Sequence, residues 1–171
     1  MPAFAVADDS VVLTVADVRY NNLTRLLTRY GLSLQLLDDG ADITGSFWGE
    51  PEAGVVGRNV YVRLDTPVHS LLHETCHVIC MDEERRECLH RDAGGDDLEE
   101  SAVCYLQILL ADHIAGVGRS RLMQDMDAWG YSFRLGDTQC WFESDAGDAR
   151  AWLLERELVT AADNPVFSLR T

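Results

Sequence analysis

The residues best suited to chemistry lie at positions 73–77, which read His-Glu-Thr-Cys-His. In a helix, residues four positions apart lie about one turn apart on one face, so the imidazoles of His73 and His77 can reach a single metal ion. Glu74 would then lie beside the ion without binding it, and its carboxylate could take a proton from a metal-bound water. The pattern predicts a catalytic metal site with His73 and His77 as ligands and Glu74 as general base.

The residues around this motif favour a buried helix. Leu71, Leu72, Val78 and Ile79 flank it, and a helix that is apolar on all sides belongs in the middle of a fold. Polar side chains in such a helix need partners, because burying them unpaired costs several kcal/mol. A metal ion would supply that partner. The alternative is a pair of hydrogen-bonded core histidines with a surface glutamate.

A catalytic zinc usually has three protein ligands, so a third ligand is expected downstream. A helical projection of the segment after Asp97 places Glu99 on the apolar side with Leu106, and Glu100 on the other side with Gln107. Asp97 is expected to cap this helix, with Glu100 completing the capping box. We therefore expect Glu99 to be the third ligand and keep Glu100 as an alternative. The other candidates are His90, Asp92, Asp96, Asp97 and His113.

The motif followed by a glutamate on the next long helix is similar to the gluzincin branch of the zincin metallopeptidases. The stretch Glu99-Glu100-Ser101-Ala102 also resembles the E-x-x-A form of the second motif, which ImmA/IrrE-like peptidases share. The resemblance covers roughly residues 55–115. The metzincin pattern is absent, and SprT-like proteases, which also contain His-Glu-x-Cys-His, use a histidine as third ligand.

The resemblance implies a zinc-dependent peptidase that hydrolyses peptide bonds in a peptide or protein substrate. It implies that His73, His77 and Glu99 bind zinc and that Glu74 is the general base. It also implies that the strand preceding the motif, residues 55–64, forms an edge that pairs with an extended substrate. The alternative function is a metal-stabilised binding or regulatory module that keeps the scaffold without turnover.

Other residues could complete the site. Stabilising the oxyanion needs a hydrogen-bond donor beside the metal, and a residue on the face of His73 could line the pocket. The tryptophans are better explained as packing anchors than as a binding cage. The candidate donors are His113, Tyr105, Tyr131 and Arg63, and the candidate pocket residues are His69 and Cys80.

The pattern of apolar residues predicts an α+β fold, and the resemblance implies that this fold is of the zincin type. A small mixed or antiparallel sheet would pack on the buried motif helix and on a second metal-ligand helix, followed by a helical C-terminal part. We expect one domain over residues 1–171, with a metal-site core at 55–115 and a helical extension at 119–171. Strands are predicted at 32–36, 43–48 and 55–64, and helices at 14–30, 66–81 with a charged extension at 82–87, 97–115, 120–129 and 145–158.

The composition excludes several partners. The chain has 171 residues, a net charge of −15 and 14 basic residues, all of them arginine. This acidity argues against nucleic acid or an anionic membrane as partner, because phosphate binding needs clustered cations. No apolar run is long enough to span a membrane. The N-terminus lacks the features of a secretory signal, and five cysteines are an odd number, so we expect a cytoplasmic protein with reduced thiols. The oligomeric state is left open.

Overall fold

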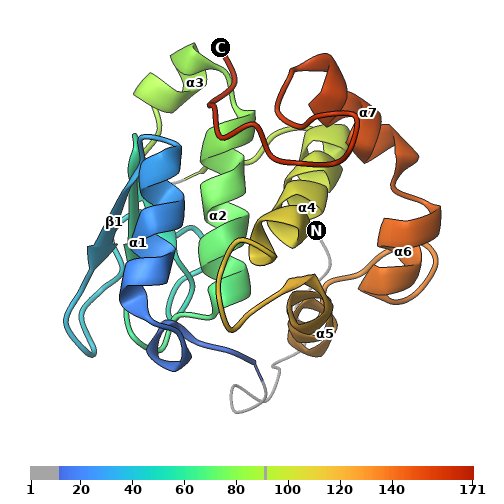
Figure 1. Ribbon diagram of the computed structural model, residues 1–171. Coiled ribbons are helices and arrows are strands. Elements are labelled where there is room, and N and C mark those ends of the chain that lie inside the picture. The colour runs from blue at the N-terminus through green and yellow to red at the C-terminus, as the bar shows by residue number, and fades with distance from the viewer. Residues whose placement is uncertain (1–11, 91) are drawn as a thin grey trace.

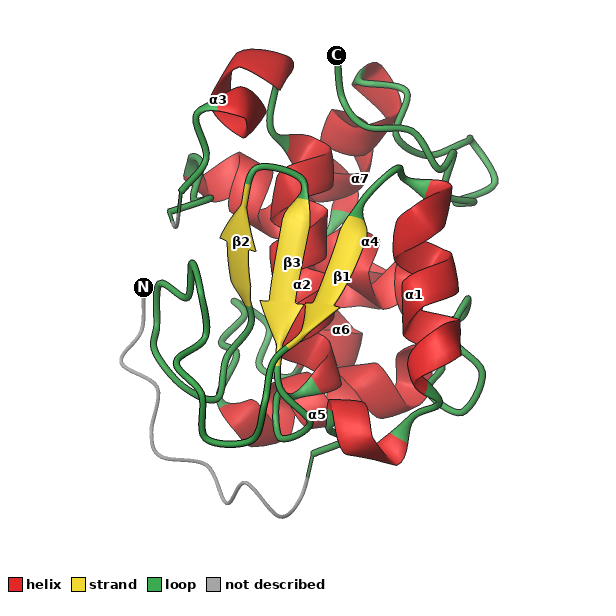
Figure 2. Cartoon of the chain, turned by 90° about the vertical axis from the view of Figure 1, so that its left-hand side faces the viewer, coloured by secondary structure: helices red, strands yellow, loops and turns green. Residues whose placement is uncertain are grey.

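The computed structural model describes residues 12–90 and 92–171, and it places a small sheet against one side of a group of helices (Figures 1 and 2). The α-helices of the described residues are α1 (Tyr20–Arg29), α2 (Val68–Cys80), α3 (Glu83–Glu87), α4 (Asp97–Ala111), α5 (Arg119–Trp129), α6 (Thr138–Ser144) and α7 (Gly147–Glu155). A short 3-10 helix, η1 (Val15–Asp17), precedes α1. The strands are β1 (Ser33–Leu36), β2 (Gly54–Val56) and β3 (Asn59–Val62). The expected α+β class is confirmed.

The sheet is mixed and has the order β1-β3-β2, with β1 parallel and β2 antiparallel to the central strand β3. Val60 of β3 pairs with Leu34 on one side and Val55 on the other. Val55, Val60 and Val62 are fully buried, and both β2 and β3 contact α2. Figure 2 shows α2 directly behind the strands. The apolar face of the sheet therefore covers one side of the helix that carries the motif.

The single strand expected at 55–64 is wrong, because the segment folds back on itself as the hairpin β2–β3. Gly57 lies at the turn with φ 58°, a left-handed conformation that glycine adopts without steric cost. The central position of β3 also means that it is not an edge open to a substrate. The prediction failed because the alternation of apolar and polar residues continues through the tight turn at Gly57.

The strand expected at 43–48 is also wrong, since this segment forms turns that cover the outer edge of β2. The backbone N–H of Val55 donates to the carbonyl of Gly45 at 3.2 Å. A Cβ atom at Gly54 would lie only 2.0 Å from the carbonyl oxygen of Thr44, so this close approach requires glycine. The edge expected to pair with a substrate is thus already occupied at Val55.

Helix α2 is buried along its whole length, as its composition predicted, and all of its residues from Val68 to Cys80 are buried. The sheet lies on one side of it and α4 on the other, and α7 packs on the far side of α4 (Figure 1). Helix α4 is consequently enclosed by helices on two sides. This enclosure determines which of its side chains can reach α2.

The C-terminal end of α2 is closed by two arginines. The last carbonyls of a helix have no partner within it and favour nearby cations. Arg86 donates from Nε to the carbonyl of Val78 at 2.9 Å and from Nη2 to that of Met81 at 2.6 Å. Arg170 donates from its backbone N–H to Ile79 at 3.0 Å and from its side chain to Cys80 at 3.1 Å. Both the segment after α2 and the C-terminal segment therefore hold this helix in place.

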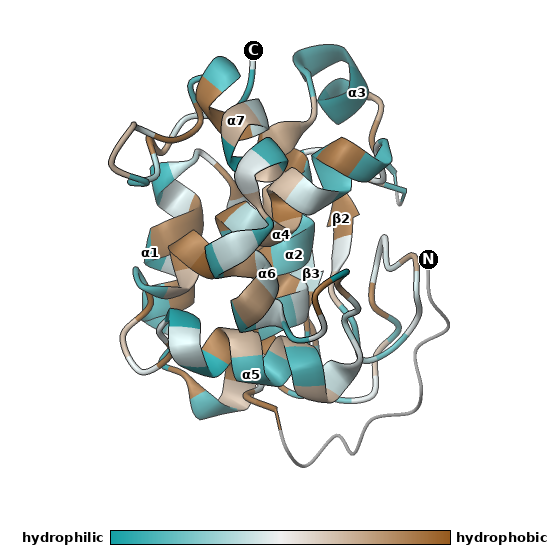
Figure 3. Cartoon of the chain, turned by 90° about the vertical axis from the view of Figure 1, so that its right-hand side faces the viewer, coloured by the Kyte–Doolittle hydropathy of each residue, from teal (hydrophilic) through white to brown (hydrophobic). Residues whose placement is uncertain are grey.

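The charged run 82–87 is not a simple continuation of α2. It forms the separate helix α3, which is hydrophilic along its length (Figure 3). Arg86 of α3 is only 1% exposed. Arg58, which lies outside α3 and pairs with Glu83 at 2.7 Å, is exposed. The charged extension expected at 82–87 is exposed to solvent at its glutamates, whereas Arg86 is buried.

The remaining helices follow the predicted segments with shifted ends. The interaction expected at Thr14 is present, since its backbone N–H donates to the carboxylate of Asp17 at 2.8 Å, but it closes η1 rather than a long helix. Helix α6 lies in a segment whose residue pattern is ambiguous and predicts no element. Within the described part of the chain, no helix combines the length and the apolar composition that crossing a bilayer requires.

The position of Arg86 leads to a stability prediction. Arg86→Ala should lower the free energy of unfolding by about 2–4 kcal/mol, because it leaves buried carbonyls of α2 without donors. Arg58→Ala removes an exposed ion pair and should cost less than about 1 kcal/mol. Urea denaturation monitored by circular dichroism measures both. Equal effects of the two substitutions would contradict the capping role of Arg86.

Candidate metal centre

The two histidines of the motif meet as the helical spacing predicts. His73 and His77 lie one turn apart on α2 with their rings nearly perpendicular, and their Nε2 atoms are 3.1 Å apart. Both residues are buried, at 9% and 5% exposure. The two ring nitrogens therefore face one common point.

The third member of the group is Glu100 of α4. One carboxylate oxygen lies 2.8 Å from Nε2 of His73 and the other lies 3.2 Å from Nε2 of His77. The potential ligand atoms of the three residues all lie within 4.8 Å of one another. Two imidazole nitrogens and a carboxylate oxygen converging in this way could hold a metal ion.

Electrostatics keeps Glu100 ionised. Partial burial acts to raise the pKa of its carboxyl group, but hydrogen bonds and charge interactions with His73 and His77 hold the pKa well below its usual value. A charged carboxylate is the form that binds a cation.

Gln107 fixes the orientation of His73. The amide nitrogen of Gln107 donates to the backbone carbonyl of His69 at 3.2 Å, so its amide oxygen faces Nδ1 of His73, 2.6 Å away. That oxygen can only accept, and Nδ1 must therefore carry the proton. Nε2 is the ring nitrogen that faces the common point, and it is therefore the one that could bind a metal ion. A polar partner on the second ring nitrogen is typical of metal-binding histidines.

The prediction that Glu99 completes the group is wrong. Glu99 is buried, as predicted from its position on the apolar side of the helical projection. Its carboxylate, however, pairs with Arg85 at 2.9 Å and lies 3.9 Å from Arg170. Gly95 packs on it so closely that a Cβ there would be 2.4 Å from the Glu99 carboxyl carbon. The cation that Glu99 faces is thus an arginine from α3.

The error has a physical cause in the surroundings of α4. The helical projection assumed one apolar face, whereas α4 packs against α2 on one side and α7 on the other. The capping residue also lies one position earlier than expected, because Asp96 rather than Asp97 accepts the N–H of Glu99 at 2.8 Å. Glu100 and Gln107 share the side that meets α2. A glutamine in an otherwise apolar stretch was the sequence signal for that side.

Glu74 lies beside the group on the wall of two cavities. It is 7% exposed, and this burial raises the pKa of its carboxyl group, with the two histidines acting in the opposite direction. A carboxyl group with a raised pKa is better suited to exchange protons near neutral pH than an ordinary glutamate. The position agrees with the role predicted for Glu74, which stays a prediction.

Two cavities flank the group and share Trp48, His73, Glu74 and Glu100 as common wall. We call them the aromatic cavity, of about 180 Å³, and the acidic cavity, of about 410 Å³. Besides the shared residues, the aromatic cavity is lined chiefly by Glu52, Ser70, Cys104, Trp129, Tyr131 and Phe133. Besides the shared residues, the acidic cavity is lined chiefly by Phe47, His77, Asp92, Gly94, Gly95 and Asp97.

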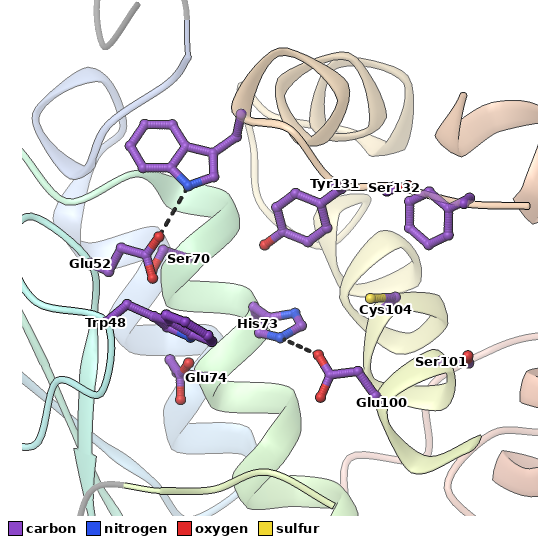
Figure 4. A pocket seen from close by; sticks show the side chains of 12 residues that line it. Trp48, Glu52, Ser70, His73, Glu74, Glu100, Ser101, Cys104, Tyr131 and Ser132 are labelled. Carbon is purple, nitrogen blue, oxygen red and sulfur yellow. Dashed lines mark hydrogen bonds and ion pairs between the residues drawn. The ribbon is translucent and has the colours of Figure 1, made fainter. Parts of the chain in front are cut away.

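Of the further candidates, Tyr131 and His69 lie in the site. Tyr131 lines the aromatic cavity (Figure 4). Its hydroxyl is 3.1 Å from Nδ1 of His69. Burial, together with the neighbouring His73, lowers the pKa of His69 to about 3, so this histidine is neutral. It supports the cavity wall and lies outside the metal-binding group, as expected.

The other candidates lie elsewhere. Arg63 pairs with Glu50 and Asp65, and His113 makes an edge-to-face contact with Phe167. The remaining candidates are also engaged elsewhere or lie outside the group: Tyr105 stacks on Phe142, Cys80 is buried on α2, and His90 is exposed. Sequence reasoning missed Glu52 and the position of Trp48 on the wall that the two cavities share, since neither residue has a neighbouring motif.

Comparisons with known proteins identify no relative: no family model, no curated protein and no solved structure matches the chain. The similarity to gluzincins therefore rests on the motif and on the group just described.

Substitution of the two adjacent glutamates separates their roles. Glu100→Gln should weaken metal binding by about 100-fold or more, because it removes the ligand charge. Glu99→Gln should leave metal affinity nearly unchanged and lower the free energy of unfolding by about 1–3 kcal/mol, because a buried partner of Arg85 is lost. Competition with a zinc chelator and urea denaturation give the two quantities. A loss of metal in Glu99→Gln with retention in Glu100→Gln would reverse our assignment.

Gln107 offers an independent check. Gln107→Leu keeps the approximate volume but removes the acceptor for Nδ1 of His73, so metal affinity should fall by about 10–100-fold. The same chelator competition measures it, with Gln139→Leu on the exposed side of α6 as the control. An unchanged affinity would show that His73 needs no partner at Nδ1.

Proposed function

We propose that this protein is a zinc-dependent peptidase of the gluzincin type. The observation that carries the proposal is the convergence of His73, His77 and Glu100 beside a buried Glu74, on a wall open to two cavities. The open cavities on both sides give an extended substrate room to pass the group. Zinc is proposed because two imidazoles and one carboxylate form a donor set typical of catalytic zinc.

The described residues contribute three ligand side chains to this group. A structural zinc site is usually closed by four protein ligands, whereas a catalytic site keeps one position for water or substrate. The count supports an enzyme over a metal-stabilised binding module. A general base at Glu74 would also have no use in a purely structural site.

When bound, zinc would polarise the scissile carbonyl and lower the pKa of a bound water. Glu74 would accept the proton of that water and later pass it to the leaving amine. Gln107 would keep His73 in the tautomer that leaves Nε2 unprotonated, and Glu100 would supply the negative ligand. Trp48 and Tyr131 would border the space in which the substrate lies.

The proposed zincin-like fold rests on the order of elements. A strand pair leads into the motif helix α2, and the next long helix, α4, supplies the glutamate. Two features depart from the family pattern. Glu100 is followed three positions later by Val103, so the E-x-x-A match does not extend to it. The edge of β2 is covered at Val55, so an extended substrate would need a different path.

The proposal is tested with Glu74→Gln, which preserves shape and removes the base. The wild-type protein should purify with about one zinc per chain and cleave members of a peptide library. Glu74→Gln should retain the zinc and lose about 10²–10⁴-fold in rate, the usual contribution of a general base. Elemental analysis and mass spectrometry of the cleaved peptides measure these outcomes. A metal-free wild-type protein, or a Glu74→Gln variant as active as wild type, would refute the proposal.

A further inference from the structure

One carboxylate in the aromatic cavity is not needed for zinc binding or for proton transfer. Glu52 precedes β2 and accepts a hydrogen bond from Nε1 of Trp129 at 3.0 Å (Figure 4). Its charge is close enough to Glu74 and His73 for both to influence its pKa. In Figure 4 the Glu52 and Trp48 side chains face Tyr131 across the cavity.

The surroundings of Glu52 favour a positively charged partner. Burial raises the pKa of its carboxyl group, which the hydrogen bond from Trp129 lowers only in part. An ionised carboxylate has about four acceptor sites, and one indole N–H fills a single site. Arg63 lies nearby in sequence, but its guanidinium is already bound by Glu50 and Asp65. A partly buried carboxylate of this kind gains from a cation brought by a ligand.

The rest of the cavity fits the remainder of such a ligand. Trp48, Trp129 and Phe133 contribute aromatic surface, which can cover the methylene stem of a long side chain. Aromatic faces also attract a guanidinium or ammonium group. An apolar wall with one carboxylate is therefore chemically matched to arginine or lysine.

The charge around the cleft agrees with this match. Among the described residues that line the two cavities there are carboxylates but no arginine. Glu74 and Glu100 belong to the metal group, and no arginine among the described wall residues is available to pair with Glu52, Asp92 or Asp97. Their summed field would draw a basic segment toward the cleft.

We propose that the aromatic cavity selects substrates with a cationic side chain beside the scissile bond, and that Glu52 is the residue that determines this specificity. The inference rests on the proposed peptidase function and names the substrate class of the same site.

The test compares three peptides that differ at one position, which holds arginine, citrulline or leucine. Citrulline has nearly the shape of arginine without its charge. The wild-type protein should prefer arginine over citrulline by about tenfold or more in kcat/KM, as expected for a hydrogen-bonded charge pair. Glu52→Gln keeps an acceptor for Trp129 and should reduce this preference to nearly one. Glu87→Gln removes an equal charge from exposed α3 and should leave the preference unchanged.

Two further measurements keep the result decisive. Raising the salt concentration should reduce the arginine preference of the wild-type protein, even if Glu52→Gln fails to fold. Titration of zinc-loaded Glu74→Gln protein with N-acetylarginine amide and N-acetylcitrulline amide reports binding without turnover, and the arginine compound should bind more tightly.

The outcomes separate the two proposals. Equal cleavage of all three peptides would overturn the specificity and leave the peptidase intact. If no peptide is cleaved although zinc is bound, the peptidase function fails, and the titration alone then decides whether the cavity prefers a cation. A preference for arginine that survives in Glu52→Gln would overturn the role of Glu52.

Discussion

The contact between α2 and α4 is the constraint on which the site depends. His73 is held at both ring nitrogens by α4, with Nδ1 against Gln107 at 2.6 Å and Nε2 against Glu100 at 2.8 Å. A small shift of either helix would disturb both contacts, because each depends on the same interhelical distance. The imidazole is therefore positioned by the core rather than by a loop, which suits a group whose geometry must be held closely.

Helix α2 is fully buried and α4 is buried beyond its N-terminal residues, so the polar backbone groups at their ends also need partners. Arg86 and Arg170 occupy the last carbonyls of α2, while Asp96 caps the first turn of α4. Glu99 then connects α4 to α3 through Arg85, beside the segment that borders the acidic cavity. The residue predicted to bind the metal thus has a structural function that also shapes the site.

Sequence reasoning was most reliable where a short-range rule applies. The spacing of His73 and His77 places both rings on one face of any helix, and the apolar flanks required burial. The third residue depended on which face of α4 meets α2, and a projection cannot resolve this for a helix with two buried sides. Gln107 could have identified that face, because a buried amide needs a polar partner. The hairpin at Gly57 was missed because tertiary pairing, not alternation, decides where a strand turns.

The positions of the arginines determine how the acidity of the chain could matter for a ligand of the cavities. A net charge by itself describes solubility, yet the position of the cations decides where negative charge remains uncompensated. Arg85 and Arg86 are committed to a buried carboxylate and to helix carbonyls, roles that suit a planar guanidinium with several fixed donors. These structural roles keep such cations off the cavity walls, where Glu52 faces the space left for a substrate. Under the proposed peptidase function, the same charge imbalance would favour a basic peptide as the ligand of this cleft.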